Sequence, residues 1–132
     1  MRTMLVALAA LAATPAAAQA PVGTWLVEHK AAVRLFDCQG ALCGRVVWLR
    51  DPALRTAEMC NRTIIWGLQT AGTGQWTDGS FLDPEDGSTY HVEMTQDSSE
   101  ELSANVYPAV SWLGETVNLI RIAPYSLNGW CS

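Results

Sequence analysis

The sequence predicts an all-β protein, an eight-stranded antiparallel up-and-down barrel. Short runs rich in β-branched and aromatic residues recur between turn residues at fairly regular spacing. Apolar and polar side chains alternate along several of these runs. No stretch of twelve residues shows a helical pattern, and no repeat or low-complexity linker divides the chain. Closing eight strands into a barrel would remove the exposed edges of an open antiparallel sheet.

The expected strands are separated by residues that favour turns, chiefly Gly, Pro, Asn and Asp. They cover residues 23–29, 32–38, 42–49, 63–68, a run beginning at 75–76, 89–95, 102–107 and 115–122. Asp78-Gly79 predicts a bulge or a break in the fifth strand. Residues 51–59 contain Pro52 and predict a longer loop or a single helical turn.

Period-2 alternation assigns the two faces of the expected wall. In the sixth strand Tyr90, Val92 and Met94 alternate with polar side chains, and the seventh strand alternates in the same way. An antiparallel sheet with one buried face has this pattern. We therefore expect one face to line the barrel and the other to contact water.

The first twenty residues have the pattern of a secretory signal peptide. Arg2 gives a positive start, residues 4–13 form a short apolar run, and small residues at 16–20 suit cleavage after Ala18 or Ala20. The run is too short for a stable membrane span. A lipoprotein signal would need a cysteine at the cleavage point, and the first cysteine is Cys38. We expect a periplasmic or secreted bacterial protein with one barrel domain at 21–132.

The charge of the expected mature chain narrows the classes of partner. Without Arg2 it carries seven basic and thirteen acidic side chains, a net charge of −6. No basic stripe is present, which argues against binding to nucleic acid or to an anionic membrane surface.

The four cysteines are even in number, as expected of disulfides in an exported chain. Four cysteines allow three pairings. We favour Cys38–Cys43, which would close a tight turn between adjacent strands, and Cys60–Cys131, which would tie the chain's end to its middle. A zinc site is the alternative, but the spacing and the lack of a second close pair do not favour it.

Several motifs carry a family resemblance. They are Gly23-Thr24-Trp25, the runs 33–38 and 42–49, and the turn 83–90 from Asp83 to Tyr90. Together they resemble the bacterial domain-of-unknown-function family 2147, over nearly all the mature chain to about Ile122. The tail at 123–132 does not match the family pattern. The resemblance implies a small exported protein with a lipocalin-like fold, and it brings no settled activity.

The lipocalin likeness implies a role for two residues. In lipocalin-type barrels a Gly-x-Trp in the first strand caps one end, and an arginine of the last strand lies over the indole. The corresponding residues are Trp25 and Arg121. Alternation puts Arg121 on the same side of its strand as Val117 and Leu119. The pair is therefore expected to close the barrel's floor through a cation–π contact.

Catalytic motifs are lacking, so we expect no catalytic residue, metal or cofactor. His29 and His91 lie in no nucleophile, metal or acid–base motif. The acidic cluster Asp83, Glu85 and Asp86 lacks the ligand spacing of a known calcium loop and is explained as a turn. A catalytic triad assembled from distant residues stays an open alternative.

The aromatic residues suggest a ligand cavity. Six tryptophans and three tyrosines are many for so short a chain. Eight-stranded barrels hold one small ligand or fill their interior with side chains. The first interpretation gives a cavity lined by some of Trp48, Trp66, Trp76, Tyr90, Val92 and Met94. In the second, the same rings simply pack.

Two functional hypotheses follow. The first is a periplasmic binding protein for a small, largely apolar ligand. The second is a protein-binding module, such as an inhibitor or envelope accessory factor, that acts through rim loops. Its expected surface is the 51–59 loop with Trp112-Leu113.

Overall fold

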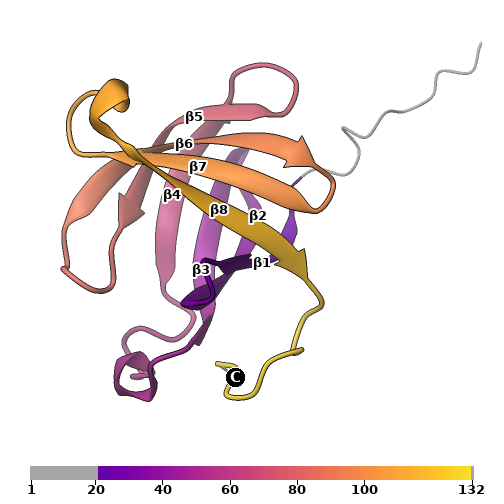
Figure 1. Ribbon diagram of the computed structural model, residues 1–132, viewed down its shortest axis with the longest axis vertical. Helices are drawn as coiled ribbons and strands as arrows, with labels where there is room; N and C mark the ends of the chain where they lie inside the picture. Colours follow the sequence, from indigo (N-terminus) through magenta and orange to yellow (C-terminus); the bar gives the residue numbers. More distant parts are fainter. Residues whose placement is uncertain (1–20, 132) are drawn as a thin grey trace, which may run out of the picture.

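The computed structural model of the protein describes residues 21–131, which form a closed barrel of eight antiparallel strands (Figure 1). Each strand pairs with the next, and β8 pairs with β1 to complete the cylinder. The strands are β1 (Gly23–Val27), β2 (Ala31–Cys38), β3 (Ala41–Leu49), β4 (Thr63–Thr70), β5 (Gln75–Leu82), β6 (Thr89–Ser98), β7 (Glu101–Tyr107) and β8 (Glu115–Ile122). The predicted fold is confirmed. The predicted signal peptide lies outside the described residues.

Two local features show how the chain turns. The first strand ends at Val27, two residues earlier than expected, because Glu28 and His29 both adopt left-handed conformations (φ 47° and 58°). They form a tight hairpin in which the Lys30 amide donates to the Val27 carbonyl at 2.9 Å. The predicted bulge in β5 is present, with a register shift between Trp76 and Gly79.

The segment between β3 and β4 contains the single helical turn that was one of the two expectations. This 3-10 turn, η2 (Pro52–Leu54), is capped by Asp51, whose side chain accepts a hydrogen bond from the Ala53 amide at 2.9 Å. Leu54 and Met59 turn inward and pack against the barrel core. A second 3-10 turn, η3 (Ser111–Leu113), lies between β7 and β8. No helix within 21–131 is long and apolar enough to cross a membrane.

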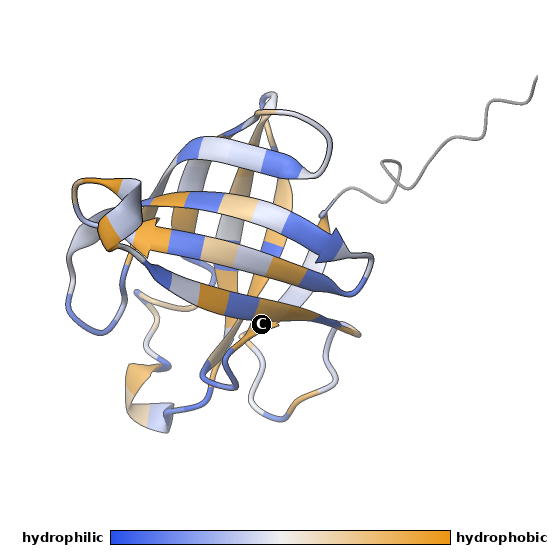
Figure 2. Cartoon of the chain, turned by 45° about the horizontal axis from the view of Figure 1, so that its top comes forward, coloured by the Kyte–Doolittle hydropathy of each residue, from blue (hydrophilic) through white to orange (hydrophobic). Residues whose placement is uncertain are grey.

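Apolar side chains fill the middle of the barrel. Figure 2 shows how apolar and polar residues alternate along the strands. The buried core consists of Trp25, Val33, Leu35, Leu42, Val46, Leu49, Ile64, Ile65, Leu68, Val92, Met94, Leu102, Ala104 and Leu119. A Cβ atom added at Gly79 would lie 2.6 Å from the side chain of Leu68. One at Gly44 would lie 3.0 Å from Leu35. The central layer therefore has no room for a ligand.

A second apolar cluster lies on the outside of the barrel. Ala32, Val47 and Trp48 are buried there beneath Leu127 and Trp130 of the C-terminal tail. The tail is fixed by hydrogen bonds from the Cys131 amide to the Val47 carbonyl (2.8 Å) and from the Trp48 indole to the Asn128 carbonyl (2.6 Å). The tail thus packs on the outer wall of the barrel and not over either of its ends.

The structure joins the cysteines in the pairing favoured from the sequence. Cys38 bonds to Cys43 across the β2–β3 hairpin, with Cα atoms 5.7 Å apart. Cys60 bonds to Cys131, with Cα atoms 5.3 Å apart, and so links the β3–β4 segment to the tail. Each disulfide restrains a different end of the barrel.

Candidate functional site

A pocket of about 400 Å³ lies at the end of the barrel where the β2–β3 and β4–β5 turns are found. Its lining residues are Pro21, Val22, Asp37, Gly40, Ala41, Leu42, Leu68, Thr70, Gly72, Thr73, Gly74, Trp76 and Gln96. Leu42 and Leu68 are buried members of the core, so the pocket's floor continues the barrel interior. This site combines an apolar floor with a polar rim, the usual composition of small-molecule sites.

Strand register explains why these side chains meet. Leu42 pairs with Leu68 across β3 and β4, and Trp76 pairs with Met94 across β5 and β6. Directly paired residues share a face of the sheet, so all of them belong to the inward face. Trp76 also pairs with Thr70, where the inward series becomes polar. The pocket is therefore the last inward-facing layer of the barrel, beyond the filled core.

The β2–β3 hairpin forms the first wall. Gln39 and Gly40 are both left-handed (φ 57° and 92°), which gives a two-residue turn. The Cys38–Cys43 disulfide crosses the hairpin directly behind this turn. This covalent link limits the hairpin's motion, so the wall keeps its shape without a ligand.

The β4–β5 turn forms the second wall. The Ala71 amide donates to the Gln75 carbonyl at 2.8 Å, which closes the turn, and Gly72 and Gly74 supply its positive φ angles. The Gln96 amide of β6 donates to the Gly74 carbonyl at 2.8 Å. This wall is thus bonded to a strand outside its own hairpin.

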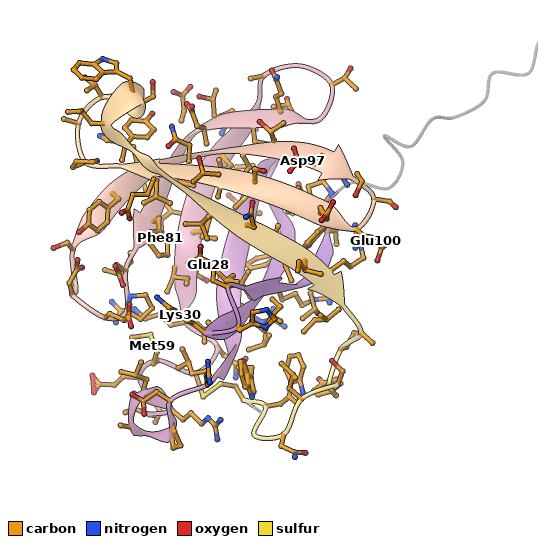
Figure 3. The ribbon with its side chains drawn as sticks, viewed as in Figure 1. Glu28, Lys30, Met59, Phe81, Asp97 and Glu100 are labelled. Atoms are coloured by element: carbon orange, nitrogen blue, oxygen red, sulfur yellow. A yellow bond between two sulfur atoms is a disulfide. The ribbon has the colours of Figure 1, made fainter. Side chains whose placement is uncertain are left out.

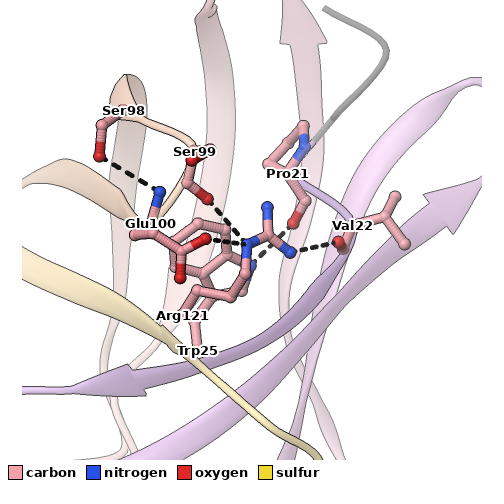
Figure 4. Close-up of polar contacts among 7 residues, drawn as sticks. All are labelled: Pro21, Val22, Trp25, Ser98, Ser99, Glu100 and Arg121. Atoms are coloured by element: carbon pink, nitrogen blue, oxygen red, sulfur yellow. Dashed lines mark hydrogen bonds and ion pairs between the residues drawn. The ribbon is translucent and has the colours of Figure 1, made fainter. Parts of the chain in front are cut away.

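Pro21 and Val22 form the third wall, and Trp25 and Arg121 hold it (Figure 4). The indole of Trp25 donates to the Pro21 carbonyl at 2.8 Å. The Arg121 guanidinium lies 4.4 Å from the indole ring centre and donates to the Val22 carbonyl (3.0 Å) and the Ser99 carbonyl (2.8 Å). The two residues were expected to close the floor of the barrel. They are in contact at one end of the barrel, where they hold one wall of the pocket and the pocket beside them stays open.

Gly23 makes this close approach feasible. A Cβ atom at Gly23 would lie 2.5 Å from the Arg121 guanidinium, and its φ of +143° is strained for other residues. Glu100 adds an ion-pair contact of 3.9 Å to Arg121, at the exposed turn between β6 and β7. The Gly-x-Trp motif therefore fastens the pocket wall to both β8 and the β6–β7 turn.

The opposite end of the barrel is plugged. Figure 3 shows Met59 and Phe81 at that end, away from Asp97 near the end of β6 and Glu100 of the β6–β7 turn. Partly buried apolar side chains there pack against the core, namely Leu54, Met59, Phe81, Leu82, Val106 and Val117. The long β3–β4 segment supplies two of these, Leu54 and Met59, and so closes this end of the barrel.

The six candidate cavity residues do not form one cavity. Trp76 lines the pocket, and Val92 and Met94 lie in the packed core. Trp48 lies outside the barrel, because the register shift between Ala32 and Val33 reverses the alternation of β3 at this point.

The two remaining aromatic residues also lie away from the pocket. Trp66 alternates with the inward Ile65, and 38% of its surface is exposed. Tyr90 is half-buried, and its hydroxyl donates to the Asp86 carboxylate at 2.6 Å. This bond raises the pKa of Tyr90 and lowers that of Asp86.

Sequence reasoning missed most of the pocket. Asp37 and Gln96 continue the inward series of Leu35 and Met94, and that alternation was readable. Leu42 and Leu68 were readable as core residues. Nothing in the pattern indicated which end of the barrel stays unfilled, because that depends on where the loops pack.

The acidic turn between β5 and β6 is built from hydrogen bonds within the turn. Asp83 accepts from the Glu85 amide at 2.8 Å, and Asp86 accepts from the Ser88 amide at 2.7 Å. Among residues 21–131 no three His, Cys, Asp or Glu side chains gather closely enough to hold a metal ion. These carboxylates therefore serve the turn.

A closed eight-stranded barrel in which a Gly-x-Trp tryptophan is covered by an arginine of the last strand defines a lipocalin-like protein. The chain belongs to the family described as "Uncharacterized protein conserved in bacteria (DUF2147)", whose model matches residues 23–121. Among solved structures it is similar to protein HP1028 from Helicobacter pylori, described as belonging to the lipocalin family.

That similarity has a TM-score of 0.64 and 19% sequence identity, and it covers 78% of this chain and 83% of the other. Identity at this level shows the shared fold alone. A search of curated proteins found no match. A lipocalin-like barrel is an architecture compatible with binding a small ligand, and the pocket identifies where this chain has space for one.

Proposed function

We propose that the protein is an exported binding protein that takes a small, largely apolar ligand in the pocket beside Trp76. The observation that carries this proposal is a pocket of about 400 Å³ with an apolar floor formed by Leu42 and Leu68. Sites for small molecules typically have volumes of roughly 300–1,000 Å³. The ligand would cover the last layer of the barrel interior.

The fastening of the three walls favours binding. A preformed site avoids the entropy loss of ordering loops, which otherwise reduces affinity. Apolar surface removed from water contributes about 25 cal/mol per Å². A small ligand that contacts the floor therefore gains affinity mainly from the apolar surface that it buries. The fixed walls determine which ligand shapes fit.

Export is part of the same proposal. Disulfides form and persist in oxidising compartments such as the bacterial periplasm. The presence of two disulfides therefore supports export, with residues 1–20 as the proposed signal peptide. We infer a periplasmic location after removal of that segment.

Native mass spectrometry of protein purified from periplasm tests the proposal. We expect extra mass of a few hundred daltons that is lost on unfolding, because apolar ligands of this size fit the pocket. A bare native mass, together with no binding of 1-octanol in solution, would contradict it.

A matched pair of variants locates the site. Trp76→Ala removes part of the pocket lining, whereas Trp66→Ala removes the same side chain from the outer face of the neighbouring strand. We expect only Trp76→Ala to weaken 1-octanol binding, measured by calorimetry. Thermal unfolding of both variants, and Trp76→Phe as a milder change, separates lost binding from lost folding.

A second candidate function rests on an exposed apolar loop. Trp112 and Leu113 are 79% and 57% exposed on η3. The loop is ordered, since the Asn105 side-chain amide donates to the Ser111 carbonyl at 3.0 Å. An ordered, exposed tryptophan is typical of a protein-binding hot spot.

This candidate surface is smaller than the sequence predicted. The 51–59 loop was expected to join it, but Leu54 and Met59 pack inward, and η2 lies far from η3 in Figure 1. An envelope protein partner would bind wild-type protein and not Trp112→Ser in a cross-linking pull-down. Identical partners for both proteins would eliminate this candidate.

A further inference from the structure

We propose that the pocket selects an amphipathic ligand with a cationic head, an alkyl or aryl ammonium, over neutral or anionic ligands with the same apolar body. This inference rests on the proposed function and concerns the same site. It is carried by the position of Asp37, a carboxylate at the pocket's edge.

Asp37 occupies an inward position of the barrel wall. Along β2 it follows the buried Val33 and Leu35 at intervals of two residues, and it pairs with the buried Leu42 across β3. Side chains at such intervals share a face of the sheet. The strand thus places a carboxylate directly above the apolar floor, where the preceding inward residues are apolar.

No basic side chain lines the pocket to balance this charge. Asp37 is the only charged residue in the lining, and its other polar members are Thr70, Thr73 and Gln96. Within residues 21–131 the Asp37 carboxylate forms neither an ion pair nor a hydrogen bond. Its negative charge is therefore available to a ligand.

The arginines nearest in sequence lie on the other face. Arg34 alternates with Val33 and Leu35, and it pairs with Arg45 on β3. The Arg45 guanidinium lies 5.6 Å from the ring centre of Phe36, on the outer side of the wall. These two cations are thus directed away from the pocket. Arg121, which donates to the Val22 carbonyl at the third wall, has the Glu100 carboxylate 3.9 Å away to offset its charge.

The remaining lining suits an ammonium head with an apolar body. The hydroxyl and amide oxygens of Thr70 and Gln96 can accept hydrogen bonds from it. The indole of Trp76 offers an aromatic face, which attracts cations as well as apolar groups. The apolar body would then lie over Leu42 and Leu68.

Three probes with one apolar chain test the selection, namely octylammonium, 1-octanol and octanoate. We expect octylammonium to bind roughly two- to fivefold more tightly than 1-octanol, and octanoate to bind more weakly than both. Added salt should reduce this preference, because Asp37 is exposed and its charge is screened by ions in solution. Calorimetry at neutral pH gives the three affinities.

Asp37→Asn is the decisive variant, and Glu58→Gln, an exposed charge at the plugged end, is its control. We expect Asp37→Asn to lower octylammonium affinity to that of 1-octanol and to leave 1-octanol affinity unchanged, with no effect of Glu58→Gln. Equal affinities of wild type for octylammonium and 1-octanol would overturn the selection but keep the binding site. An equal response to both variants would also overturn it, since general charge would then be the cause. Failure of all three probes to bind would refute the proposed function itself.

Discussion

The two ends of this barrel are built from the same eight strands and yet differ in what fills them. At one end Leu54 and Met59 of the β3–β4 segment pack onto the core. At the other end the turns are tight, and a pocket of about 400 Å³ remains above Leu42 and Leu68. The long β3–β4 segment places apolar side chains over its end of the barrel, whereas the tight turns at the other end are too short to do so.

The difference extends to how each end is held. The Cys60–Cys131 disulfide ties the plugging segment to the tail, over a sequence separation of 71 residues. The Cys38–Cys43 disulfide, with a separation of five, restrains one hairpin of the pocket. One end is therefore built for stability and the other for a fixed shape, and variants at each end should separate these properties.

The largest effect is expected from the two disulfides. Replacing Cys60 and Cys131 by Ser should lower the free energy of unfolding by about 4 kcal/mol, against about 2 kcal/mol for Cys38 and Cys43, because the longer loop gains more entropy when unlinked. The loss of affinity for 1-octanol should follow the reverse order and be larger when Cys38 and Cys43 are replaced. Urea unfolding and calorimetry measure the two properties. Loss of binding only in the Cys60/Cys131 variant would contradict the proposal that the Cys38–Cys43 end holds the binding site.

Arg121→Ala should have the next largest effect, about 3 kcal/mol of stability, since it removes the contact with Trp25 and two charge-assisted hydrogen bonds. It should also weaken 1-octanol binding, because Val22 loses its restraint. Arg121→Lys keeps the charge without the planar fork and should recover only part of both. Unchanged affinity in a folded Arg121→Ala protein would show that the third wall does not need this clamp.

Leu54→Ala should cost about 1–2 kcal/mol, less than a fully buried leucine, because Leu54 is only partly buried against the core. Its effect on 1-octanol affinity should be negligible. Thermal unfolding and calorimetry on the same preparation test both statements. An increase in affinity would mean that removing the Leu54 side chain opens a second site at this end.

The smallest effect is expected at the Tyr90–Asp86 hydrogen bond on the exposed β5–β6 turn. The raised pKa of Tyr90 gives a stabilisation present below its ordinary value near 10 and lost as pH rises through the raised pKa. The lowered pKa of Asp86 gives one present above its ordinary value near 3.8 and lost as pH falls through the lowered pKa.

Tyr90→Phe should therefore differ from wild type at neutral pH and converge with it at both extremes. Urea unfolding at acidic, neutral and alkaline pH measures this. Tyr107→Phe is the control on the acidic side, since burial and not a hydrogen bond to a carboxylate is the main cause of the raised pKa of Tyr107. A pH-independent difference for Tyr90→Phe would assign its effect to packing.

The sequence was sufficient for the barrel because alternation and turn residues are local signals. The inward series ending in Val92 and Met94, the β5 bulge and the Trp25–Arg121 pair could all be read from it. Trp48 was misplaced because the irregular register beside Ala32 leaves no mark in either strand alone. The pocket's position was not readable, because it depends on long-range packing of Leu54 and Met59.

The same limit applies to the C-terminal tail. Its cysteine predicted a link to the middle of the chain, but the outer cluster around Trp48 became visible only in three dimensions. Gly129 contributes here through close packing, since a Cβ atom would lie 2.6 Å from the Arg55 guanidinium. Such contacts between distant segments have no periodic pattern in sequence.

We propose that a ligand binds at the Trp25–Arg121 end of the barrel and not at the plugged end. Amide chemical shifts during titration with 1-octanol distinguish the two ends, because they report on every strand in one experiment. We predict saturable changes concentrated at Leu42, Leu68 and Trp76, with the amides of Leu54, Met59 and Phe81 unmoved. Changes concentrated at the second group would place the site at the opposite end and contradict the account.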